Sequence, residues 1–115
     1  MLKVYFKNNC ATCRTTLAMM KDNTKEKIET VEYLVDTPSE EEIKDILKML
    51  GMKAFQLVRT KEQLYHEKYA GKKISNAQWI KLLHRNPILI ERPIIVKDGK
   101  AIIGRPIERI IEFIG

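Results

Sequence analysis

The sequence predicts an α/β domain built on a small mixed sheet, with a block of helices inserted between the two halves of the sheet. Three observations predict it: a strand–helix–strand pattern near the start, helical periodicity across the middle, and a hairpin followed by a helix at the end. No linker or repeat separates these segments, and 115 residues can bury a hydrophobic core. We therefore expect one domain over residues 1–115, with the helical insertion at about 38–87.

The first part of the chain shows strand alternation, then helical spacing, then strand alternation again. Val4 and Phe6 share one face of an expected strand over Leu2–Phe6, and a helix is expected over Thr12–Met20. After a break at residues 22–24, Ile28–Leu34 alternates as a second strand. These elements supply the first half of the predicted sheet.

The helical block begins with a strong N-terminal signal. Ser39 can cap a helix, Glu42 can complete a capping box, and Gly51 is a suitable terminator. Shorter helical pieces are expected over residues 54–58 and 62–69, and a further helix follows its N-cap Ser75 and stops near Asn86-Pro87.

The last third returns to strand periodicity. Ile94–Val96 and Ala101–Ile103 flank Asp98-Gly99, a dipeptide typical of a tight hairpin turn. Pro106–Ile114 then predicts a closing helix with an isoleucine stripe. This hairpin and helix complete the predicted sheet domain.

Composition limits the classes of function. Hydrophobic residues make up 44% and charged residues 31%, which is typical of a soluble globular protein. We find no signal-peptide pattern and no apolar run long enough for a membrane span, so we expect a cytoplasmic protein without membrane contact. The net charge is +6, but aromatic residues do not alternate with basic ones, which disfavours direct nucleic-acid binding.

Cys10-Ala11-Thr12-Cys13 lies where the first expected strand gives way to the first expected helix. The unpaired N–H groups and the positive end of the helix dipole favour a thiolate there, so we expect the pKa of Cys10 to fall below the free-thiol value of about 8.5. A Cys-x-x-Cys pair beside a strand–helix–strand pattern is typical of a thioredoxin-like redox motif. Zinc would need four ligands, and beyond the two cysteines only His66 and His84 remain, in no recognised zinc spacing. We expect no metal.

Three arginines occupy unusual positions. Arg59 lies between two apolar helical pieces, Arg92 precedes Pro93, and Arg105 lies between Gly104 and a second proline. Most arginines of a basic protein are solvated, but proline and glycine restrict the backbone that directs the last two side chains. Planar guanidinium groups suit oxyanions, and such groups would also stabilise a thiolate.

The chain resembles the glutaredoxin-coupled ArsC-type arsenate reductases, which share a thioredoxin-like fold with the Spx regulators. The resemblance covers essentially the whole chain and is carried by Asn9–Arg14, Leu57–Arg59, Asn86–Ile94 and Gly104–Pro106. It implies that Cys10 is the nucleophile that takes up arsenate or a similar oxyanion. It also implies that Arg59, Arg92 and Arg105 hold the oxyanion and the thioarsenate intermediate.

The resemblance implies further roles. Pro93 is expected in the cis form, facing Cys10, while Asn9 and Arg14 flank the thiol and support its loop. No cofactor is expected to stay bound; glutathione is the implied co-substrate and glutaredoxin the implied protein donor. Cys13 could resolve a mixed disulfide at Cys10, or could simply replace a serine of the loop.

The chain departs from the well-known enzymes in ways that leave alternatives open. Those enzymes carry serine in place of Cys13, a histidine in place of Phe6, and a C-terminal extension, whereas Spx proteins carry two cysteines in the motif. Arg105, which Spx-like members usually lack, favours the enzyme. The alternatives are an Spx-like redox sensor that binds RNA polymerase and a general glutathione-linked thiol reductase.

Overall fold

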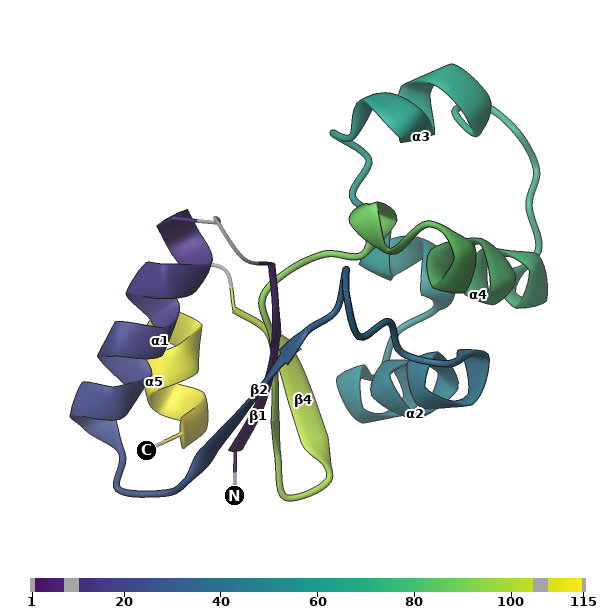
Figure 1. Ribbon diagram of the computed structural model, residues 1–115. Helices are drawn as coiled ribbons and strands as arrows, with labels where there is room; N and C mark the ends of the chain where they lie inside the picture. Colours follow the sequence, from purple (N-terminus) through teal and green to yellow (C-terminus); the bar gives the residue numbers. More distant parts are fainter. Residues whose placement is uncertain (1, 8–10, 105–107, 115) are drawn as a thin grey trace. The chain divides into compact units, whose positions relative to one another are not determined.

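The computed structural model describes residues 2–7, 11–104 and 108–114 (Figure 1). A sheet unit takes the described residues up to Asp36 and from Arg92 onward, and a helical unit takes Thr37–Glu91. Each unit is built around its own elements. The predicted fold class, a small mixed sheet with an inserted block of helices, is confirmed.

The sheet unit has four strands in the order β2-β1-β3-β4. Strand β1 (Leu2–Phe6) lies parallel to β2 (Ile28–Glu32) and antiparallel to β3 (Ile94–Lys97). Strand β4 (Lys100–Ile103) pairs antiparallel with β3 through a tight turn. Asp98 and Gly99 both have positive φ in that turn, the conformation for which an Asp-Gly pair is suited.

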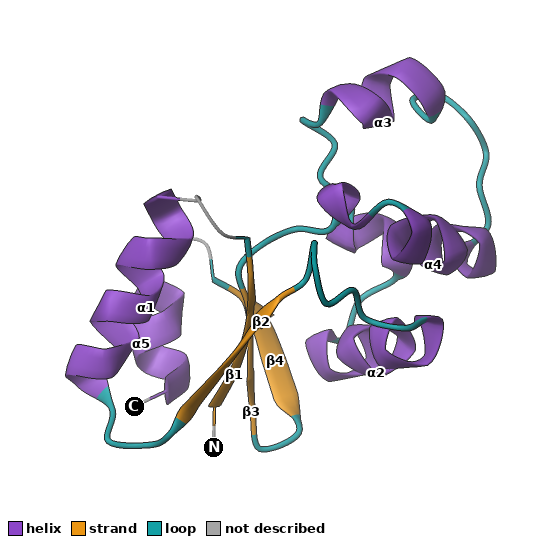
Figure 2. Cartoon of the chain, viewed as in Figure 1, coloured by secondary structure: helices purple, strands orange, loops and turns teal. Residues whose placement is uncertain are grey.

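Two helices cover one face of the sheet. Helices α1 (Ala11–Asn23) and α5 (Glu108–Ile114) lie side by side there, as Figures 1 and 2 show. Between these helices and the sheet lies a core whose fully or almost fully buried members are Leu2, Val4, Met20, Ile95, Ile110 and Ile114. The alternation of β1 and the isoleucine stripe of α5 therefore meet in one hydrophobic layer.

The helical unit contains three α-helices and two short 3-10 helices among its residues. These are α2 (Glu40–Leu50), η1 (Ala54–Leu57), α3 (Gln63–Lys68), α4 (Asn76–Arg85) and η2 (Pro87–Leu89). The predicted caps form: the Ser39 hydroxyl accepts a hydrogen bond from Glu42 N at 3.1 Å, and the Ser75 hydroxyl accepts one from Gln78 N at 3.2 Å.

Element boundaries differ from the sequence predictions at several points. Strand β2 ends at Glu32 rather than at residue 34, because Glu32 O accepts hydrogen bonds from both Val35 N and Asp36 N and so turns the chain. The short helical piece expected over residues 54–58 is a 3-10 helix over Ala54–Leu57. Helix α1 extends to Asn23, whose side-chain amide donates to Met19 O. None of the described helices is long and apolar enough to cross a membrane.

Gly104 packs tightly just after β4. A Cβ atom built at this position would lie 2.7 Å from Ile95 Cδ1, 2.8 Å from Ile110 Cδ1 and 3.0 Å from Pro93 Cγ. Its N–H donates to Pro93 O at 2.8 Å, so the backbone has little room to move away. Only glycine fits here without a shift of the core.

We expect Gly104→Ala to lower the free energy of unfolding by about 1–3 kcal/mol, because it overpacks a filled core. Ile95→Val removes the methyl group that lies closest to the added Cβ. The double variant should therefore lose less stability than the sum of the two single changes, measured by urea denaturation. Strictly additive losses would show that the contact with Ile95 does not limit the site.

Candidate active site

Three strand ends that lie close in the sequence to four predicted site residues occur at one end of the sheet. Tyr5 of β1 pairs with Ile94 of β3, and Ile94 pairs with Ile103 of β4. Strand β1 thus ends beside the start of β3 and the end of β4. In the sequence, Cys10 follows β1, Arg92-Pro93 precede β3, and Arg105 follows β4.

Arg92 is buried at this end of the sheet, with 6% of its surface exposed. Its Nη1 donates a hydrogen bond to the hydroxyl of Tyr33 at 3.3 Å. Tyr33 is itself held by its backbone N–H, which donates to Phe6 O at 3.3 Å where β1 ends. The guanidinium therefore has a direction set by residues of three different strand ends.

The Arg92–Pro93 peptide bond is cis, the isomer expected for it. Pro93 O accepts the hydrogen bond from Gly104 N, so the residue after Arg92 is joined to the residue before Arg105. Asn9, Cys10 and Arg105 lie outside the described residues, so the predicted approach of Pro93 to Cys10 stays a prediction.

Helix α1 begins at Ala11, directly after Cys10 in the sequence. The helix turns Cys13, Thr16 and Met20 inward, and none of the three has exposed surface. Cys13 therefore lies on the buried face of the helix, whereas Arg14 lies on its exposed face. Cys13, the second cysteine of the motif, is therefore shielded from solvent, whereas Arg14, the next residue, is exposed.

Arg59 belongs to the helical unit and is held between two carboxylates. Its Nε donates to Glu62 Oε1 at 3.3 Å, and its Nη1 lies 3.7 Å from Glu91 Oε1. Its backbone is fixed as well, since Arg59 N donates to Leu89 O at 2.7 Å. The Arg59 guanidinium, 18% exposed as a side chain, is therefore oriented but already paired with negative charge.

Three of these contacts could not be found from motif positions alone. Tyr33 directly follows a strand and shows no special pattern, while Glu62 and Glu91 resemble ordinary surface carboxylates in the sequence. The position of Glu91 next to Arg92 was a weak signal. Among the described residues, no group of three or more His, Cys, Asp or Glu side chains could hold a metal ion.

The amino-acid sequence is similar over nearly its whole length to those of known proteins. The model of the ArsC family matches residues 5–113. The uncharacterized protein YfgD of Escherichia coli K12 is 41% identical over 116 residues, covering 99% of this chain and 97% of that protein. An arsenate reductase of Haemophilus influenzae is 34% identical over 113 residues, covering 96% and 97%.

Solved structures agree with the sequence matches. The structure of an arsenate reductase from Vibrio cholerae superimposes with a TM-score of 0.89 at 34% identity, covering 96% of this chain and 95% of that one. The thioredoxin-like fold predicted from the sequence is confirmed by such likeness.

We expect Tyr33→Phe to lower the free energy of unfolding by about 1–2 kcal/mol, because it removes a buried acceptor from the Arg92 guanidinium. Tyr69→Phe is a suitable control, since the Tyr69 hydroxyl makes no hydrogen bond within the described part of the chain. Equal stability of the Tyr33 variant and the wild type in urea denaturation would contradict this assignment.

Proposed function

This chain belongs to the ArsC family, and we propose on that basis that it is a thiol-dependent oxidoreductase that reduces arsenate with Cys10 as the nucleophile. The observation that carries the proposal is the position of these three strand ends at one end of the sheet. There β1 leads toward Cys10, and the buried Arg92 lies directly before β3. Relatives named arsenate reductases at similar length support the choice of substrate.

In the proposed reaction the Cys10 thiolate attacks the arsenic of arsenate, and water leaves. Arg59, Arg92 and Arg105 are proposed to neutralise the oxyanion and the thioarsenate that forms. The bidentate fork of each guanidinium matches the spacing of oxygens on a tetrahedral anion. The positive end of α1, which begins just after Cys10, would add to the same stabilisation.

The electrons come from two thiols. Glutathione attacks the sulfur of the thioarsenate, forming a mixed disulfide with Cys10 and releasing arsenite. Arsenic gains two electrons in this step, and the two thiols lose two as the S–S bond forms. The mixed disulfide is then cleared by glutaredoxin or by Cys13; in the second case glutathione leaves and a Cys10–Cys13 disulfide remains to be reduced.

The assay is arsenate-dependent NADPH oxidation in the presence of glutathione, glutathione reductase and glutaredoxin. Wild-type protein should turn over arsenate, and Cys10→Ser should reduce the rate to background. Arg92→Lys keeps the charge but loses the fork, so its kcat/KM should fall about tenfold or more without a matching loss of folding. Absence of arsenate-dependent oxidation in the wild type would refute the proposed substrate.

A second candidate function, a redox sensor that binds RNA polymerase, is favoured by one observation: the second cysteine of the motif. Cys13 has no exposed surface in its thiol form. A sensor requires Cys13 to pair with Cys10 on oxidation, so Cys13→Ser would abolish its redox response. An enzyme served by glutaredoxin would keep its arsenate turnover in that variant.

Arg59 generates a separate prediction, because Glu62 and Glu91 compete with any anion for its guanidinium. Glu62→Gln and Glu91→Gln should each lower the KM for arsenate by about two- to fivefold, the scale of a partly exposed ion pair. Glu67→Gln, on the same helical unit, makes the same charge change and has no ion pair with Arg59 in the described structure. A decrease in KM as large in this control would attribute the effect to net charge alone.

A further inference from the structure

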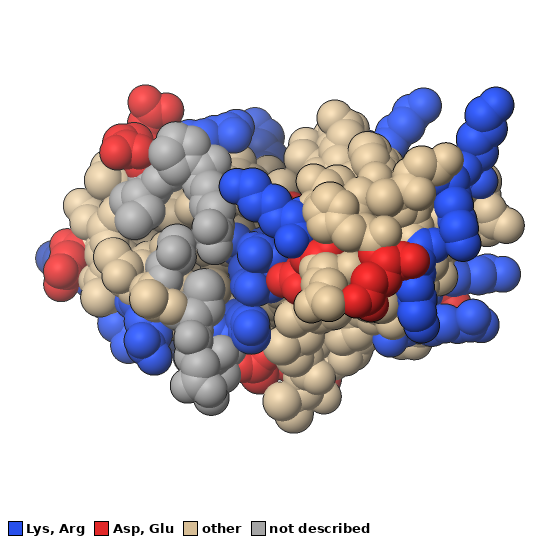
Figure 3. Space-filling model, turned by 90° about the horizontal axis from the view of Figure 1, so that it is seen from above, with Lys and Arg blue, Asp and Glu red and all other residues tan. Residues whose placement is uncertain are grey.

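Positive charge is concentrated in one segment of the helical unit. Residues 68–90 contain five lysine or arginine residues and no aspartate or glutamate, so this segment contributes five of the six net positive charges. Figure 3 shows lysine and arginine side chains projecting at the right of the view, with few carboxylates among them. Such segregation is uncommon on a surface that serves solubility alone, where the two signs are interspersed.

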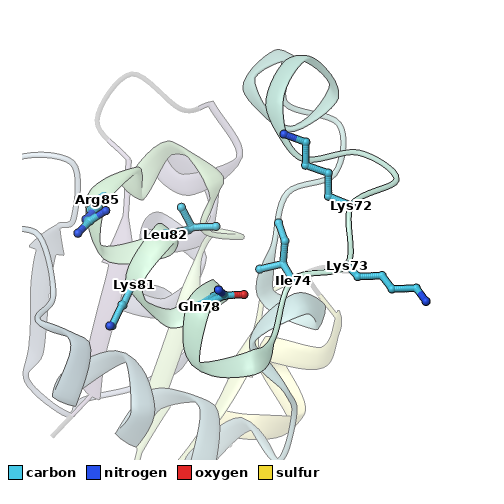
Figure 4. Close-up of a pocket in the computed structure, with 7 residues that line it drawn as sticks. All are labelled: Lys72, Lys73, Ile74, Gln78, Lys81, Leu82 and Arg85. Atoms are coloured by element: carbon cyan, nitrogen blue, oxygen red, sulfur yellow. The ribbon is translucent and has the colours of Figure 1, made fainter.

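Four of these cations surround a hollow in the helical unit. The hollow has a volume of about 370 Å³ and is lined by Lys72, Lys73, Ile74, Lys81, Leu82 and Arg85 together with the amide of Gln78. Figure 4 shows that the first three lie on the chain before α4, while the rest project from the helix. Among the residues that the structure describes, no carboxylate lines the hollow.

The α4 residues of the hollow form one stripe of the helix. Gln78, Lys81, Leu82 and Arg85 follow the i, i+3, i+4, i+7 spacing, whereas Trp79, Ile80 and Leu83 on the other side are buried. The stripe spans about two helical turns, or about 10 Å, which matches about three residues of an extended peptide.

A second hollow of about 620 Å³ continues from the first. It shares Lys72, Lys73, Ile74 and Gln78 with it and adds Phe55, which is 47% exposed, together with Ser75 and the buried Trp79. Together these surfaces are here called the α4 trough. Its apolar side chains, Ile74, Leu82 and Phe55, are called its floor, and its four cations are called its rims. An apolar side chain could cover the exposed edge of Phe55 and the partly buried Leu82.

Within the described residues, the cations of the α4 trough make no ion pairs. None of Lys72, Lys73, Lys81 and Arg85 pairs with a carboxylate in the part of the chain that the structure describes. This differs from Arg59 and Lys44, which are paired within the same unit. The charge of the trough is therefore complementary to an external anion.

We propose that the α4 trough binds an acidic peptide segment of a protein partner, with carboxylates on the cationic rims and an apolar side chain on the floor. A site that offers both cationic and apolar side chains suits an extended peptide better than a compact anion. Nucleic acid is disfavoured, because the Trp79 ring is buried and packs against Phe55, Tyr65 and Tyr69 rather than offering a free face for a base.

The test uses the whole chain and a fluorescein-labelled octapeptide in which four glutamates flank two leucines. Binding is followed by fluorescence anisotropy, and amide shifts in heteronuclear NMR spectra show which residues respond. The double variant Lys81→Gln/Arg85→Gln should weaken binding about fivefold or more, the scale of two exposed ion pairs. Amide shifts should map to residues 72–85.

Lys44→Gln/Lys48→Gln is the matched control. It removes two lysines at the same i, i+4 spacing from α2, with Lys48 in the last turn of that helix as Arg85 is in α4. Equal weakening by the control variant, no binding of the peptide, or equal binding of a peptide with serines for leucines would each overturn the proposal. Tighter trough-dependent binding of an octathymidylate would overturn it in favour of nucleic acid. Whether the chain reduces arsenate is measured in a separate assay, and neither result there changes how the peptide-binding results are interpreted.

Discussion

The hydrogen bond from Gly104 to Pro93 connects the core of the sheet unit to its candidate active site. It joins the start of β3 to the end of β4, and the absence of a side chain at Gly104 lets Ile95 and Ile110 close over the same point. Arg92 precedes the bonded proline, so its backbone position depends on this packing. The core and the site are therefore mechanically coupled: a change in the fit of α5 against the sheet would be transmitted to the backbone next to Arg92.

Two arginines proposed for anion binding are held by different physical means. Arg92 donates a hydrogen bond to the neutral hydroxyl of Tyr33, which helps to fix the direction of its guanidinium. Arg59 receives two carboxylates, which fix its direction but reduce the positive potential around it. An anion that bound the Arg59 guanidinium would therefore have to displace these carboxylates.

The parts of the fold predicted from the sequence are those with local signals. Ser39 and Ser75 cap helices because a hydroxyl at that position bonds the next turn, and Asp98-Gly99 turns because both residues accept positive φ. The end of β2 was harder to predict from the sequence: the strand ends early where the Glu32 carbonyl accepts hydrogen bonds from two amides of the following turn. Likewise, Arg92 could be singled out from its proline, but its partner Tyr33 lies 59 positions away in the chain and has no local signature.

The burial of Cys13 has a consequence for how its thiol reacts. A sulfur with no exposed surface meets an oxidant or an alkylating reagent only when the structure around it opens. The rate at which Cys13 is modified would therefore report how often this part of the fold opens locally, in the way that amide exchange does for a backbone proton. Thr16 is buried on the same face of the helix, and its hydroxyl lacks a hydrogen-bond partner among the described residues. The rate at which Cys13 reacts would thus be limited by local opening of the fold rather than by the intrinsic reactivity of its thiol.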